Sequence, residues 1–174
     1  MIIKKEGKIK GELKVEGDLA LTGNLEVEKG IKVSGNIFCA GYSIKAGDSI
    51  EAGYSIKAGG SIEAGDSIKA GGSIEAGYSI KAGGSIEVGG SILSQLWIKC
   101  ETTLKAGLYI YAGLVTWRAF KEGDDLIECG KLEGGEVKCG QLKELGLPED
   151  RREEIGLPDE IVIEGVKYIK EDDC

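Results

Sequence analysis

Apolar residues recur every six positions along most of the chain. From Ile44 to Ser91 the unit is Ile, a charged residue, Ala or Val, Gly, a residue that is Asp, Tyr or Gly, and Ser, repeated without a gap. The order apolar, charged, apolar predicts a strand of three residues whose first and third side chains point inward. Gly and Ser follow each strand and predict a corner, because Gly can adopt backbone angles that other residues avoid.

The same period extends beyond the regular array in both directions. It persists in a looser form upstream from Leu13 and downstream as far as Ile110, and one extra residue near Ser43 shifts the position of Gly within the unit. A single hexad cannot bury its own apolar side chains, so its stability must come from stacking on neighbouring coils. The pattern therefore predicts an all-β fold in the form of a β-solenoid.

The charged positions indicate how many hexads make one coil. Lys and Glu alternate strictly at the second position of successive hexads, beginning with Lys45 and Glu51. With two hexads per coil, Lys45 would stack on Lys57, whereas with three hexads it stacks on Glu63. Stacked like charges oppose the fold and stacked opposite charges support it. We therefore expect a triangular solenoid with about 18 residues per coil, and about six coils between residues 9 and 117.

The last third of the chain has a different composition and predicts a second region. Residues 122–174 carry 17 acidic and 7 basic residues, whereas residues 1–121 are close to neutral. We expect a solenoid over 1–121 and a small acidic, β-rich C-terminal cap over 122–174.

Within the cap, apolar residues recur every five positions from Ile127 to Leu142. They predict short strands or one more coil, with a possible hairpin at Gly134 and Gly135. Pro148 predicts the start of a short helix, and the segment from Ile161 to Ile169 predicts a strand, a turn and a strand.

Outward positions become apolar after Ile92, which marks a candidate interface. A contiguous apolar patch on a surface is typical of an interaction site. The candidates, with Ile3 added for the uncapped N-terminal edge, are Ile3, Tyr78, Leu93, Leu96, Trp97, Tyr111, Leu114, Val115 and Trp117. Two interpretations stay open: the C-terminal tail covers this patch, or a partner does.

Composition argues against catalysis and against a resident cofactor or metal. The chain has no His, so every mechanism that needs imidazole is excluded, and the corner serines have no base to activate them. Cys129 with Cys139, and Asp48 with Asp66, are weak candidates for metal sites, and we expect none. The carboxylates of the cap that could face a partner are Asp124, Asp125, Glu149, Asp150, Glu153, Glu154, Asp159 and Glu160.

Three resemblances accompany these patterns. The period and the triangular coil resemble the hexapeptide-repeat left-handed β-helix, whose acyltransferases commonly use a catalytic His that this chain lacks. The stretch from Gly17 to Ile37 resembles the bactofilins, which are polymer-forming cytoskeletal proteins of bacteria. The Ser-Ile-Lys-Ala-Gly-Gly array resembles uncharacterised repeat proteins of phages and gut bacteria, which implies an origin in a mobile element.

These observations together favour a non-catalytic binding protein. We expect a rigid solenoid that presents an apolar face and an acidic end to a protein partner, such as a nucleic-acid-handling host defence complex that a phage protein would inhibit in the manner of an anti-CRISPR. A bactofilin-like polymer and a virion or fibre spacer are the alternatives. We expect a homodimer or small homo-oligomer in the cytoplasm, with no direct nucleic-acid binding because the net charge is −8, and no membrane association.

Overall fold

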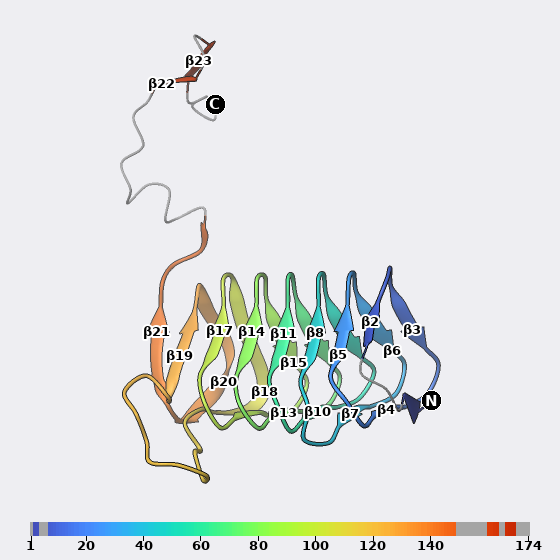
Figure 1. Cartoon of the computed structure of the whole chain (residues 1–174). Coiled ribbons are helices and arrows are strands. Elements are labelled where there is room, and N and C mark those ends of the chain that lie inside the picture. Colours follow the sequence, from blue (N-terminus) through green and yellow to red (C-terminus); the bar gives the residue numbers. More distant parts are fainter. Residues whose placement is uncertain (1, 4–6, 149–159, 164–165, 170–174) are drawn as a thin grey trace.

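The protein is a β-solenoid with three flat faces (Figure 1). The computed structural model describes the backbone of residues 2–3, 7–148, 160–163 and 166–169, and the side chains of residues 8–148. Strands of three residues alternate with corners, and the chain visits the three faces in turn. The triangular solenoid expected from the charge pattern is confirmed.

Each face is a stack of parallel strands. Face A consists of β1 (Ile2–Ile3), β4 (Leu19–Leu21), β7 (Ile37–Cys39), β10 (Ile56–Ala58), β13 (Ile74–Ala76), β16 (Ile92–Ser94) and the last part of β18 (Thr103–Tyr111). Face B consists of β2 (Gly7–Ile9), β5 (Leu25–Val27), β8 (Ile44–Ala46), β11 (Ile62–Ala64), β14 (Ile80–Ala82), β17 (Ile98–Cys100), β19 (Leu126–Cys129) and β21 (Gln141–Glu144). Face C consists of β3 (Leu13–Val15), β6 (Ile31–Val33), β9 (Ile50–Ala52), β12 (Ile68–Ala70), β15 (Ile86–Val88) and the first parts of β18 and β20 (Lys131–Cys139). The last part of β20 lies on face A, beside the last part of β18.

The register between stacked strands follows the sequence period. Ile56 lies opposite Ile74 and Ile62 opposite Ile80, which is a step of 18 residues per coil. The step from Ile37 to Ile56 is 19 residues, so the extra residue near Ser43 is absorbed in a corner.

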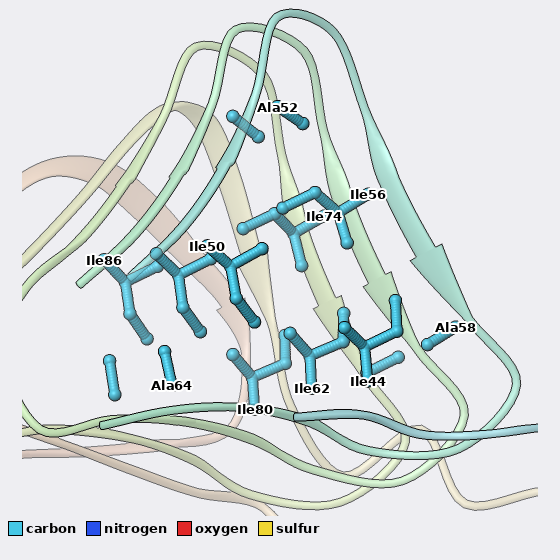
Figure 2. Packing of buried hydrophobic residues seen from close by; sticks show 14 of the residues in the cluster. Ile44, Ile50, Ala52, Ile56, Ala58, Ile62, Ala64, Ile74, Ile80 and Ile86 are labelled. Atoms are coloured by element: carbon cyan, nitrogen blue, oxygen red, sulfur yellow. The ribbon is translucent and has the colours of Figure 1, made fainter. Parts of the chain in front are cut away.

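Inward side chains form one continuous hydrophobic core. The isoleucines that open the hexads are fully buried, and burial of each contributes about 1.5–3 kcal/mol. Figure 2 shows them in rows, one row from each face, with Ile44, Ile62 and Ile80 in the same row. Ala fills the third position of most regular hexads, so the interior between the rows is narrow.

The repeated glycines are required by space and not by backbone angle. None of the described glycines with positive φ lies between Ile44 and Ser91, so the expected role of unusual backbone angles is wrong there. A methyl group on Gly65 would instead overlap the carbonyl oxygen of Gly47 in the coil before it, and Gly83 stands in the same relation to Gly65. Stacked corners approach so closely that only glycine fits.

The repeated serines complete the hydrogen bonding of the corners. Ser55 Oγ accepts a hydrogen bond from the backbone N–H of Ser73 at 3.1 Å, and Ser73 Oγ accepts one from Ser91 at 3.1 Å. Asn36 Oδ1 takes this role one coil earlier, accepting from the N–H of Ser55. These bonds satisfy backbone donors where the strand ladder is interrupted.

The acidic segment after residue 121 adds coils to the same solenoid. Strand β19 pairs with β17, β20 with β18, and β21 with β19, so the solenoid has about eight turns and not six. The hairpin suggested at Gly134 and Gly135 is wrong, because both residues lie within β20, which follows β18 around a corner with register shifts.

The remaining expectations for the cap concern the end of the chain. Strands β22 (Glu160–Ile163) and β23 (Val166–Ile169) form an antiparallel hairpin, which confirms the two predicted strands. The turn predicted between them lies outside the described residues. The helix expected after Pro148 lies outside the described residues. No helix in the described part of the chain is both long and apolar enough to cross a membrane.

Candidate protein-binding surface

Along the regular shaft the outward positions form columns of alternating charge. Lys57 lies opposite Glu75, with Nζ and Oε2 2.8 Å apart, and Lys69 lies opposite Glu87 at 3.5 Å. These pairs are exposed to solvent, so each contributes only a few tenths of a kcal/mol. Their self-complementary pattern supports stacking and offers no apolar surface to a partner.

The column on face A changes from charged to apolar towards the C-terminal end. Glu75 is followed by Leu93 and then by Tyr111, which lie opposite each other on adjacent strands. Both side chains are half-buried. Leu93 and Tyr111, two of the sequence candidates, are therefore neighbours on face A.

The corner between faces A and B carries the other apolar candidates. Its backbone ladder runs from Tyr42 through Gly60 and Tyr78 to Leu96. The next residue in the ladder is Gly113, whose N–H donates to Leu96. Leu114 and Val115 therefore begin a loop instead of stacking directly on Leu96 and Trp97.

That loop, residues 113–125, is inserted at the corner between β18 on face A and β19 on face B. Because of it, Ile98 lies opposite Ile127, 29 residues away. Trp117 meets Tyr78 edge to face, with ring centroids 5.4 Å apart. Arg118 lies over the Trp117 ring at 4.9 Å, an attractive cation–π geometry.

An ion pair holds the loop in this conformation. The Arg118 guanidinium donates two hydrogen bonds to Asp124, at 2.7 and 2.6 Å, and the backbone N–H of Lys121 donates a third at 2.7 Å. Asp124 is only 7% exposed. The hydrogen bonds from Arg118, with that from Lys121, hold the pKa of Asp124 below its ordinary value.

The result is an aromatic corner, which we define as Tyr78, Leu96, Leu114 and Trp117. Tyr78 is 43% exposed and Trp117 is 51% exposed. A groove of about 380 Å³ beside it is lined by Leu93 and Leu114. Gln95 also lines this groove, and its Oε1 is buried without a hydrogen-bond partner in the described part of the chain.

The other sequence candidates are not all part of this surface. Trp97 is half-buried, with the Lys99 ammonium 5.5 Å from its ring, and Val115 is half-buried in the loop. Ile3 lies in β1 at the opposite end of the solenoid, opposite Leu21. The patch therefore does not include the N-terminal edge.

The acidic candidates lie in different settings. Asp124 is bound to Arg118 and so helps to fix the loop, while the backbone carbonyl of Asp125 accepts a hydrogen bond from Gln141. Five candidates lie outside the described residues, namely Glu149, Asp150, Glu153, Glu154 and Asp159. Glu160 lies at the start of β22.

Sequence reasoning missed the role of Arg118, because the loop lies outside the hexad pattern and carries no spacing signal. It also missed exposed apolar side chains at other corners, including Tyr54, Leu108 and Tyr109. Tyr54 had a signal, since it takes the same place in its hexad as Tyr78.

The described cysteines are free thiols that pack within the solenoid. Cys39, Cys100 and Cys129 are buried free thiols, and Cys139 is half-buried. Cys100 and Cys129 are neighbours in the core, and their mutual hydrogen bond together with burial raises the pKa of Cys100. No group of three or more potential metal ligands occurs among the described residues.

Comparisons with known proteins do not assign the chain to a family. No family model, no curated protein and no solved structure matches the chain. Its own geometry establishes a β-solenoid of parallel stacked coils with a repeat of about 18 residues.

Proposed function

We propose that the protein is a non-catalytic binding protein whose solenoid holds the aromatic corner against a protein partner. The observation that carries this proposal is the exposure of Tyr78 and Trp117, in edge-to-face contact, on a corner that a loop held by an ion pair completes. Along the regular shaft, in contrast, the face columns carry Lys and Glu.

The chemistry of the corner suits a protein partner. Aromatic residues are enriched in the centres of protein interfaces, where they contribute much of the binding energy, and charged residues are depleted there. The side chains that define the corner are all apolar or aromatic, while Lys57 and Glu75 border the adjoining groove.

The solenoid would contribute rigidity. Each strand of the shaft is hydrogen-bonded on both sides, and the corners are bridged by serine side chains. A surface that is ordered before binding loses little conformational entropy when the partner arrives.

Capture from a lysate of the native host, with matched variants, tests this proposal. Tyr78→Glu and Leu114→Glu should abolish capture of a partner that wild-type protein retains, while the thermal unfolding midpoint changes by a few degrees at most. Tyr54→Glu is the matched control, because Tyr54 takes the same hexad position at another corner and is 64% exposed. Equal capture by wild type and both corner variants would refute the proposal.

A bactofilin-like polymer is the second candidate, supported by the N-terminal end of the solenoid. Strands β1, β2 and β3 each pair with only one strand among those described. Unpaired edges of this kind are templates for another chain. Light scattering coupled to size-exclusion chromatography separates the two candidates: a mass that grows steadily with concentration supports the polymer, and a fixed mass supports the discrete binding protein.

A nucleic-acid-handling host defence complex stays the partner that we predict from the sequence. If the protein inhibited such a complex by presenting its acidic end in place of nucleic acid, this would require free carboxylates. Asp124 does not supply one, because Arg118 neutralises it.

A further inference from the structure

The solenoid ends at its C-terminus in an apolar triangle, one side chain from each face. Leu132 lies opposite Leu104 on face C, Val137 opposite Ile110 on face A, and Leu142 opposite Ile127 on face B. We call Leu132, Val137 and Leu142 the terminal triad.

The triad is the only layer of the core at this end without a described layer above it. Leu142 is 40% exposed, whereas Ile127, one coil below, is fully buried. Leu132 and Val137 pack against the core but are only partly buried. Water contact with inward-facing aliphatic side chains costs the hydrophobic free energy that every inner coil gains.

The backbone at this end is open as well. Strand β20 pairs only with β18, and β21 only with β19, among the described strands. Solenoids need a terminal cap because an open coil exposes both its core and its unpaired edges.

The same chain contains a hairpin that needs a surface. In the β22–β23 ribbon the register pairs Ile161 with Tyr168 and Ile163 with Val166. Because strand residues two apart share a face, these four apolar residues belong to one face of the ribbon. An isolated two-stranded hairpin is marginally stable in water and requires packing against something else.

We infer that the β22–β23 hairpin covers the terminal triad and closes the C-terminal end of the solenoid. The chain leaves the solenoid at the right place, because the N–H of Leu145 still donates to Cys129 in the ladder. The 11 residues between Pro148 and Glu160 can span up to about 36–40 Å. One side of the triangle, six residues long, spans at most about 20 Å, so the connection reaches every part of this end.

Closure by the hairpin has a consequence for assembly. A second copy that presented its open β1–β3 coil could otherwise continue the stack on β20 and β21, and repeated head-to-tail contacts would give a filament. With the hairpin in place, growth at this end stops. The hairpin would thus keep the protein discrete, leaving the aromatic corner as a separate surface.

Cross-linking of engineered cysteine pairs tests this inference in the full-length chain. The background carries Cys139→Ser and Cys174→Ser, which leaves Cys39, Cys100 and Cys129 buried. Leu142→Cys combined with Ile161→Cys should be bridged by a short bis-maleimide within one chain, as peptide mapping of monomeric protein would detect. Leu142 tolerates the change because it is already partly exposed.

The control pair is Tyr54→Cys with Ile161→Cys, which places the first cysteine on the exposed shaft. At least tenfold faster bridging from position 142 than from position 54 is the expected result. Equal rates, no bridging from position 142, or bridged dimers in place of bridged monomers would each overturn the inference. Partner capture through the aromatic corner is unaffected by these outcomes, so the two proposals fail separately.

Discussion

The regular shaft, residues 44–91, and the C-terminal coils, residues 92–144, share one cross-section but differ on the outside. Both place an apolar row inward on each face, and both stack in parallel register. The shaft shows Lys and Glu, whereas the C-terminal coils show Leu93 and Tyr111 on one face and carry a loop at the adjacent corner. Inward positions are thus fixed by stacking, whereas the outward positions and the corner between faces A and B are where the coils can differ in function.

The largest loss of stability should come from replacing a glycine at a corner of the shaft. Gly65→Ala should destabilise the fold by about 3 kcal/mol or more, because the new methyl group overlaps the carbonyl oxygen of Gly47 and the corners must separate. Gly134→Ala in the last coil is the control. Its Cβ would lie 3.4 Å from the nearest atom, which is ordinary contact. Urea unfolding measures both, and equal losses would contradict the close-stacking explanation.

The loop of the C-terminal coils should respond to pH through Asp124. Hydrogen bonds from Arg118 lower the pKa of Asp124 in the folded protein below 3.8. The stabilisation is therefore complete above pH 3.8 and is lost as the pH falls through the lower, folded pKa. Trp117 emission in a Trp97→Phe background should stay constant down to about pH 4 and change below it.

Asp124→Asn is the matched variant for this titration. It should give the acid form of the Trp117 signal already at pH 7, because the neutral amide cannot form an ion pair with the Arg118 guanidinium. A transition of equal size in Asp124→Asn, or a midpoint well above 3.8, would show that another group controls the loop.

A smaller effect should come from the charge column of the shaft. Lys57→Glu puts like charges opposite Glu75 and should cost about 0.5–1 kcal/mol. The double variant Lys57→Glu/Glu75→Lys should recover most of this loss. The cycle is clean because the other neighbours of the pair in the column are Phe38 and Leu93, which are uncharged. A double variant no more stable than the single one would argue against the column as a source of stability.

The smallest effect on stability should come from placing a charged residue, as the shaft has, at an outward position of the C-terminal coils. Leu93→Lys places a cation opposite Glu75 on a half-buried outward position. We expect the free energy of unfolding to change by less than about 0.5 kcal/mol. Partner capture should nevertheless fall, because Leu93 borders the groove beside the aromatic corner. Unchanged capture would confine the binding surface to the corner itself.

Much of the fold could be predicted because its constraints are local and periodic. The alternation of Lys45 and Glu63 was enough to set three hexads per coil, and the extra residue near Ser43 changed only a corner. The role of Gly65 was not predictable from its hexad alone, because the atom it avoids belongs to Gly47, one coil away.

The candidate site was only partly predictable. Apolar residues in outward positions identified Tyr78 and Trp117, since any such departure is visible against a strict repeat. Their edge-to-face contact and the Arg118–Asp124 pair were not predictable, because the loop that creates them follows no period. For residues 127–142 the sequence left two alternatives open, short strands or one more coil, and the structure continues the solenoid there. The apolar spacing of five did not decide between them, because register shifts between β18 and β20 accommodate it.

Site-specific photo-cross-linking shows whether a partner binds at Tyr78. The photoreactive amino acid p-benzoylphenylalanine would replace Tyr78 in one protein and Tyr54 in another, each irradiated in a lysate of the native host. We expect one discrete adduct from position 78 and none from position 54, with both proteins equally folded. Adducts of the same partner from both positions, or no adduct from position 78, would contradict the claim that the aromatic corner is the binding surface.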